Sequence, residues 1–140
     1  MDRMTSATIP DLELTVPARP ENVAVVRHAM GGLGDATEVS DQTLADIKLA
    51  VTEACTNVVV HAYPNGEGPL VVRASIDGDL VTVVVADRGR GITPRPDSPG
   101  LGLGLPLIAT LADSLELGTG AAGETEVRMS FRLSDAVVAA

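Results

Sequence analysis

The strongest constraint on the fold lies in residues 70–86, where two apolar segments flank a tight-turn signal. Leu70–Ile76 and Leu80–Ala86 are both rich in valine, and Asp77-Gly78 stands between them. An Asp-Gly pair between two such segments is typical of a β-hairpin. Apolar residues occupy both faces of the second segment, which predicts a strand that is partly covered on each side. A sheet is therefore expected at the centre of the molecule.

The flanking segments predict a single α+β domain arranged as a two-layer sandwich. Further strands are predicted at residues 12–16, 114–117 and 126–133, and helices at residues 21–30, 41–62 and 105–112. This order predicts a mixed, mostly antiparallel sheet with the helices packed on one face. The domain is expected to span residues 11–134, between a flexible N-terminus at residues 1–10 and a tail at residues 135–140.

The composition limits the classes of partner that the chain binds. Its formal net charge of −9 should repel nucleic-acid backbones and anionic lipids. An aromatic content of 1% leaves few side chains on which bases could stack. The sequence contains no apolar run as long as a membrane span and no apolar signal-peptide centre near its start. We therefore expect a cytoplasmic protein without direct nucleic-acid or membrane contact.

Residues 52–63, TEACTNVVVHAY, repeat a polar side chain every four positions within an apolar helix. Glu53, Asn57 and His61 fall opposite the apolar stripe at about 100° per residue. Glu53 and Asn57 form either a solvated helix face or a site in which an amide oxygen binds Mg²⁺ and a carboxylate accepts a proton from a hydroxyl. His61, near the helix end, is expected to have a structural or dipole-stabilising role.

The segment Asp87-Arg88-Gly89-Arg90-Gly91 follows the second strand of the hairpin directly. It is either a simple turn or the mouth of a pocket, where the Asp87 carboxylate would accept a hydrogen bond from an exocyclic amine. The glycines would let a flat ring approach the backbone closely.

The segment PGLGLGLPLI carries Gly100, Gly102 and Gly104 just before the predicted helix at residues 105–112. This loop is either a flexible hinge or an anion site, because free backbone N–H groups and the positive end of a helix dipole would meet there. The Rossmann fingerprint fits poorly, since these glycines come late in the chain, and no Gly-Lys-Ser/Thr is present for a phosphate loop.

The order of these parts resembles the Bergerat-fold ATPase and kinase superfamily, and most closely the small bacterial anti-sigma-factor serine kinases. EACTNVVVHAY is similar to the N box of that group, DRGRGI to its first glycine box and GLGLPLI to its second. The resemblance runs from about Leu12 to Leu133 and implies that the chain uses ATP and Mg²⁺.

The resemblance also implies a role for each matched residue. Glu53 would be the catalytic base, Asn57 would ligate the Mg²⁺ that bridges the ATP phosphates, and Asp87 would bind the adenine amine. The remaining implied nucleotide-binding residues are Gly89, Gly91, Gly100, Gly102, Leu103, Gly104 and Thr125. Arg95 is either a ligand of the terminal phosphate or an ordinary surface arginine.

By resemblance, the chain is expected to be a homodimeric anti-sigma factor and serine-protein kinase. It would sequester a sigma factor and phosphorylate a small anti-anti-sigma antagonist on serine. Two alternatives remain: a nucleotide-sensing binding module without transferase activity, and a detached histidine-kinase catalytic domain. The segment Ile92–Pro99 between the glycine boxes is short and contains no lysine, which keeps the first alternative open.

Overall fold

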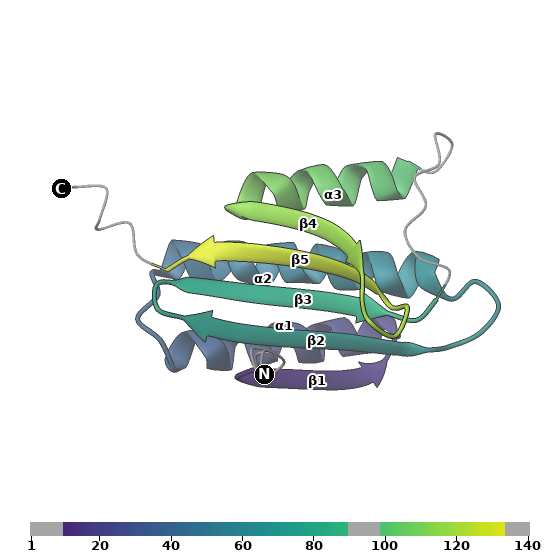
Figure 1. Cartoon of the computed structure of the whole chain (residues 1–140), viewed down its shortest axis with the longest axis horizontal. Coiled ribbons are helices and arrows are strands. Elements are labelled where there is room, and N and C mark those ends of the chain that lie inside the picture. The colour runs from purple at the N-terminus through teal and green to yellow at the C-terminus, as the bar shows by residue number, and fades with distance from the viewer. Residues whose placement is uncertain (1–9, 90–98, 134–140) are drawn as a thin grey trace.

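A five-stranded antiparallel sheet runs through the described part of the chain. The computed structural model describes residues 10–89 and 99–133, with the backbone alone for residues 99–103. The elements, in chain order, are β1 (Leu12–Pro17), α1 (Pro20–Asp35), α2 (Asp41–Asn57), η2 (Val58–Ala62), β2 (Pro69–Asp77), β3 (Leu80–Asp87), α3 (Pro99–Leu111), β4 (Ser114–Thr119) and β5 (Thr125–Arg132). Figure 1 shows their arrangement.

The strand order is β1-β2-β3-β5-β4, and each neighbouring pair is antiparallel. The hairpin predicted around Asp77-Gly78 is present, and Gly78 takes the positive φ of 62° that the turn requires. The predicted α+β class is confirmed. The described strands contain no parallel pair, because β2–β3 and β4–β5 are hairpins and β1 and β5 also run antiparallel to their neighbours.

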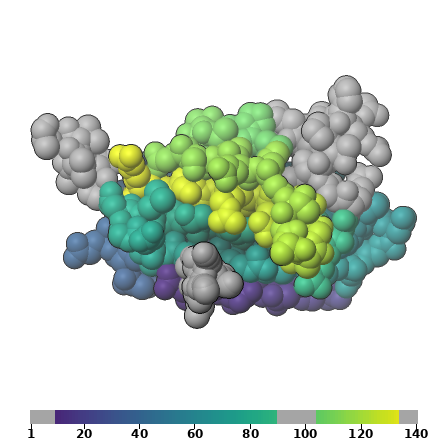
Figure 2. All heavy atoms as spheres, in the orientation of Figure 1, coloured from purple at the N-terminus to yellow at the C-terminus, as the bar shows by residue number. Residues whose placement is uncertain are grey.

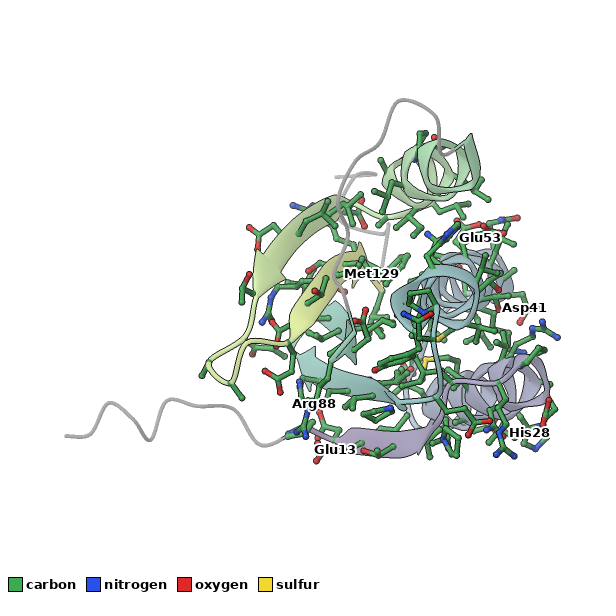
Figure 3. All side chains as sticks on the ribbon, turned by 90° about the vertical axis from the view of Figure 1, so that its right-hand side faces the viewer. Glu13, His28, Asp41, Glu53, Arg88 and Met129 are labelled. Carbon is green, nitrogen blue, oxygen red and sulfur yellow. The ribbon has the colours of Figure 1, made fainter. Side chains whose placement is uncertain are left out.

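The three helices lie on one side of the sheet, as predicted (Figure 3). Alternation along the strands sends one set of side chains toward the helices, where Met129 of β5 is fully buried. Helix α2 contributes the opposite apolar stripe. The largest fully buried side chains of this core include Phe131, Met30, Ile47, Leu70 and Ile108.

Helix α1 is longer than the sequence predicted, because the prediction placed its end at residue 30. It begins at Pro20 and continues through Gly31 and Gly32 to Asp35. Leu33 extends the buried stripe of this helix and joins the core. Burial of such a side chain is worth about 1.5–3 kcal/mol, which is comparable to the combined cost of Gly31 and Gly32 at about 1 kcal/mol each.

The predicted start of the third helix, near residue 105, is also wrong, because α3 begins at Pro99. Gly100, Gly102 and Gly104 therefore lie inside the helix rather than in a loop before it. Pro99 at the first position suits a helix start. The small residues allow α3 to pack closely on α2, and this tertiary contact stabilises a segment of low intrinsic helix propensity.

No helix from the described residues covers the other face of the sheet, and Figure 2 views the molecule from this side. On this face Arg73 of β2 pairs with Glu13 at 3.2 Å and with Glu126 at 3.7 Å. Beside these ion pairs lies a hollow of about 580 Å³ lined in part by Thr82, Val84 and Arg128. Among the described residues, no helix is long and apolar enough to cross a membrane.

Candidate functional site

Helix α2 positions the two candidate residues Glu53 and Asn57. Its start is fixed by Ser40, whose side chain accepts a hydrogen bond from the Thr43 N–H at 3.0 Å. Glu53 and Asn57 occupy the last two turns, one turn apart, and both are half-buried. Glu53 lies on the side of α2 toward α3 (Figure 3). The spacing of four thus places a carboxylate and an amide side by side.

The side-chain amide of Asn57 lacks a hydrogen-bond partner at one atom. Its Nδ2 is buried and is unpaired among the described residues. A buried polar atom without a partner costs free energy and calls for an explanation. Because the amide rotates by half a turn with little change of shape, its oxygen fits the same position. The site is therefore suited to a polar or cationic ligand at Asn57.

Asp87 ends β3 as a buried carboxylate. Asp87 is only 4% exposed, and its Oδ1 accepts a hydrogen bond from the Gly89 N–H at 2.8 Å. Burial raises the pKa of Asp87, and the hydrogen bond from Gly89 opposes that shift in part. Among the described residues, no other hydrogen bond to this carboxylate is present. Within the described residues its second oxygen therefore has no donor, an arrangement that suits a ligand amine.

The turn after Asp87 packs directly on the end of the helix that carries Asn57. A β-carbon on Gly89 would overlap the carbonyl oxygen of Ala62, so this close approach requires glycine. Ala62 follows Asn57 by five residues, or roughly 7 Å along a helix axis. The turn after Asp87 therefore contacts the C-terminal end of η2, the helical segment that directly follows Asn57.

Thr125 is the first residue of β5 and lies directly opposite Asp87 on the neighbouring strand. It is half-buried. The structure thus brings Thr125 beside Asp87, where the resemblance implied a threonine near the adenine.

The second glycine segment reaches the site through α3. Gly104 is buried against Asn57, while Gly100, Gly102 and Leu103 lie in the preceding turns, where only the backbone is described. Since α3 begins at Pro99, the N–H groups without helical partners belong to the residues just after Pro99 and not to those after Gly104. The backbone N–H groups that a predicted anion site would use therefore lie near Gly100, and the site itself stays a prediction.

Two residues implied by the resemblance, Gly91 and Arg95, lie outside the described residues. The described residues contain no group of three or more His, Cys, Asp or Glu side chains that could hold a metal ion. The other ligands of a Mg²⁺ ion at Asn57 would therefore be phosphate oxygens and water, a coordination that Mg²⁺ commonly adopts. The unpartnered amide fits this kind of ion.

One residue at the site was missed by the sequence reasoning. Tyr63 follows η2, and its hydroxyl group donates to the Pro69 carbonyl oxygen and accepts from the Arg88 N–H. The available signal was that Tyr63 is the only tyrosine in the chain and stands at the end of the helix predicted to carry Glu53 and Asn57.

A comparison with protein families matches residues 16–131 to the histidine kinase-like ATPase domain. The chain belongs to this family. The match extends from β1 to β5 and includes Glu53, Asn57 and Asp87.

Similar curated proteins include serine-protein kinases named RsbW. The RsbW of Halalkalibacterium halodurans is 37% identical over 121 residues, which are 76% of this chain and 74% of that protein. The RsbW of Bacillus cereus is 32% identical over 76% of each chain. An anti-sigma F factor of Thermoanaerobacter is 30% identical over 130 residues, covering 85% of this chain and 91% of that protein.

Solved structures show the same fold. The RsbU and RsbW domains of Rv1364c from Mycobacterium tuberculosis match with a TM-score of 0.70 and 28% identity. That match covers 90% of this chain and 33% of the other, so this chain spans about a third of that protein. The histidine kinase domain of a blue-light activated kinase from Erythrobacter litoralis matches at 23% identity with a TM-score of 0.57, which shows likeness of fold alone.

Proposed function

We propose that this chain is an anti-sigma factor with ATP-dependent serine-protein kinase activity. The observation that carries the proposal is the buried Nδ2 of Asn57, which has no hydrogen-bond partner among the described residues. Asn57 lies one turn from Glu53, and the turn after the buried Asp87 packs on the end of η2. The names of the relatives, which are serine-protein kinases and an anti-sigma factor, support a protein substrate and a sigma-factor partner.

The chain's own groups would bind the two ends of the nucleotide. Asp87 would accept a hydrogen bond from the adenine amine with the carboxylate oxygen that Gly89 leaves available. Thr125 would border the ring from the neighbouring strand. The oxygen of the Asn57 amide would bind the ion, which neutralises phosphate charge when present. The first N–H groups of α3 would face the phosphates.

Glu53 would act on the protein substrate. A carboxylate within reach of the serine hydroxyl would accept its proton as the oxygen attacks the γ-phosphorus of ATP. The bond between that phosphorus and the bridging oxygen would break, and ADP would leave. Because phosphoryl transfer depends mainly on positioning and charge neutralisation, the rigid spacing of Glu53 and Asn57 on α2 would contribute as much as the base itself.

The sigma-factor partner is proposed from the name of one relative, an anti-sigma F factor, and the antagonist from the family resemblance of the sequence. A sigma factor would be held by the chain, and an anti-anti-sigma antagonist would be phosphorylated on serine, which would place the protein in the cytoplasm. We also propose a homodimer through β1 and α1, because β1 is an edge strand of the sheet with one side unpaired in the described chain.

The proposal is tested by calorimetry followed by a transfer assay. Purified protein is titrated with ATP, with and without MgCl₂, and is then incubated with γ-labelled ATP and a native lysate. We expect Mg²⁺-dependent binding and a new phosphoserine on a small protein, identified by mass spectrometry. A sigma factor should copurify.

Three other outcomes contradict the proposal in different ways. No heat with Mg-ATP would overturn nucleotide binding itself. Binding without transfer to any protein would favour the nucleotide-sensing module, and transfer to a histidine would favour the histidine-kinase catalytic domain.

A further inference from the structure

Tyr63 connects three segments of the chain through one hydroxyl group. It stands directly after η2, and its phenol donates a hydrogen bond to the carbonyl oxygen of Pro69 at 2.5 Å, at the start of β2. The same oxygen accepts a hydrogen bond from the Arg88 N–H at 2.8 Å, just after β3. The phenol thus joins the helix that carries Asn57 to the strand end that carries Asp87.

The hydrogen bond to Arg88 acts on the turn that orients Asp87. Asp87 is followed by two backbone N–H groups, and each has one partner: Arg88 N–H donates to Tyr63, and Gly89 N–H donates to Asp87 Oδ1. With both amides held, the peptide planes after Asp87 have a fixed orientation. The carboxylate then keeps Oδ1 engaged with the Gly89 N–H, which fixes the position of its second oxygen.

The ring of Tyr63 is itself fixed by packing. A β-carbon on Gly68 would overlap the edge of the ring, so the ring lies directly against the backbone of the loop before β2. Tyr63 is half-buried, and burial is the main cause that raises the pKa of its hydroxyl, which stays protonated at neutral pH. The hydroxyl can therefore donate to Pro69 and accept from Arg88 together.

We propose that Tyr63 is a positioning residue that sets the orientation of the Asp87 carboxylate for recognition of the exocyclic amine of a purine. This inference rests on the proposed function, in which ATP binds with its amine at Asp87. Tyr63 does not touch the nucleotide in this proposal. It acts through the Arg88 and Gly89 amides, so its contribution should be confined to ligands that carry the amine.

The test compares two ligands that differ only in that amine. ATP and purine riboside triphosphate, which has hydrogen in place of the amino group, are titrated with Mg²⁺ into wild type and Tyr63→Phe. Phenylalanine keeps the ring packed on Gly68 and removes both hydrogen bonds. We expect ATP affinity to fall about tenfold, while affinity for the analogue changes less than about twofold.

A matched control removes a different half-buried hydroxyl from the sheet. Thr82→Val eliminates the 3.2 Å hydrogen bond between Thr82 Oγ1 and Ser130 Oγ on the helix-free face. It should leave both affinities unchanged. Gly68→Ala gives a second route to the same effect, because its methyl group displaces the Tyr63 ring while the hydroxyl stays in the chain. It should also reduce ATP affinity selectively.

The outcomes separate this inference from the proposed function. If Tyr63→Phe lowered the affinities for both ligands equally, the role of Tyr63 would be merely structural. If it left ATP affinity unchanged, the orientation of Asp87 would not depend on Tyr63. Either result overturns the inference and leaves the proposed function intact. If wild-type protein bound neither ligand, the proposed function and the inference would both fail. If wild type bound both ligands with equal affinity, Asp87 would not recognise the amine. The proposed role of Asp87 and this inference would then both be wrong.

Discussion

Gly104 of α3 lies so close to Asn57 of α2 that a β-carbon at residue 104 would stand 2.6 Å from Nδ2 and 3.1 Å from Oδ1. The two helices therefore meet at a residue without a side chain. The contact shields the Asn57 amide, whose Nδ2 is buried and unpartnered within the described chain. A glycine at 104 thus determines whether the candidate magnesium ligand keeps its orientation.

Gly104→Ala should weaken Mg²⁺-dependent ATP binding by about tenfold or more, because the new methyl group must displace the Asn57 amide. Stability should change little, since the end of a side chain moves more easily than backbone and alanine favours helix by about 1 kcal/mol. Calorimetry with Mg-ATP and thermal unfolding measure the two effects.

A steric control is available in α1. A β-carbon on Gly34 would also stand 2.6 Å from the end of a side chain, Leu44 Cδ2, but away from the site. Gly34→Ala should leave ATP affinity unchanged. If it weakened binding as much as Gly104→Ala, the contact between Gly104 and Asn57 would have no special role.

Glu53→Gln should retain ATP affinity within about twofold and reduce the rate of phosphoserine formation by about 10²–10⁴-fold, because the amide cannot accept the hydroxyl proton. Asp46→Asn is the control on the same helix, since Asp46 lies two turns earlier on nearly the same side. It should leave the transfer rate unchanged. A Glu53→Gln protein with full transfer activity would remove Glu53 from the chemistry.

Asp87→Asn should increase stability at neutral pH and reduce ATP affinity by about ten- to a hundredfold. Burial raises the pKa of Asp87 in the folded state, so the folded chain holds this proton more tightly than the unfolded chain. The contribution of protonated Asp87 to the stability of the wild type is complete below the pKa of Asp87 in the unfolded chain. It is lost as pH rises through the pKa of Asp87 in the folded chain.

The measurement for Asp87 is urea unfolding of wild type and Asp87→Asn across the acidic range. The advantage of the variant should grow as pH rises through the raised pKa and then stay constant. A wild type that gained stability over the variant in that window would show that the carboxylate is better stabilised folded than unfolded, contrary to its burial.

Cys55 should resist alkylation in the folded protein. It is fully buried in the core, and burial raises the pKa of its thiol to about 12, so almost no thiolate is present at pH 8. Iodoacetamide should modify it only after unfolding, with a rate that mass spectrometry follows against urea concentration. Rapid labelling in native buffer would mean that α2 opens locally.

Local pattern was sufficient to predict most elements, including the hairpin at Asp77-Gly78 and the helix that carries Glu53 and Asn57. The predictions were wrong where glycines lie in helices. The first helix was expected to stop at residue 30, and Gly100 to precede α3. Both helices nevertheless include glycines, Gly31 and Gly32 in α1 and Gly100 in α3, because packing outweighs propensity. The roles of the site residues stay predictions, and Gly91 and Arg95 lie outside the described residues.

By itself, the sequence determined the class of the fold and the pairing of Glu53 with Asn57, because strand alternation and helical spacing depend only on neighbours along the chain. Only the tertiary structure decided that Gly104 would meet Asn57 and that Tyr63 would hold the turn beside Asp87. These contacts join residues that are 47 and 25 positions apart. Their geometry depends on how closely packed surfaces approach, which no local pattern encodes.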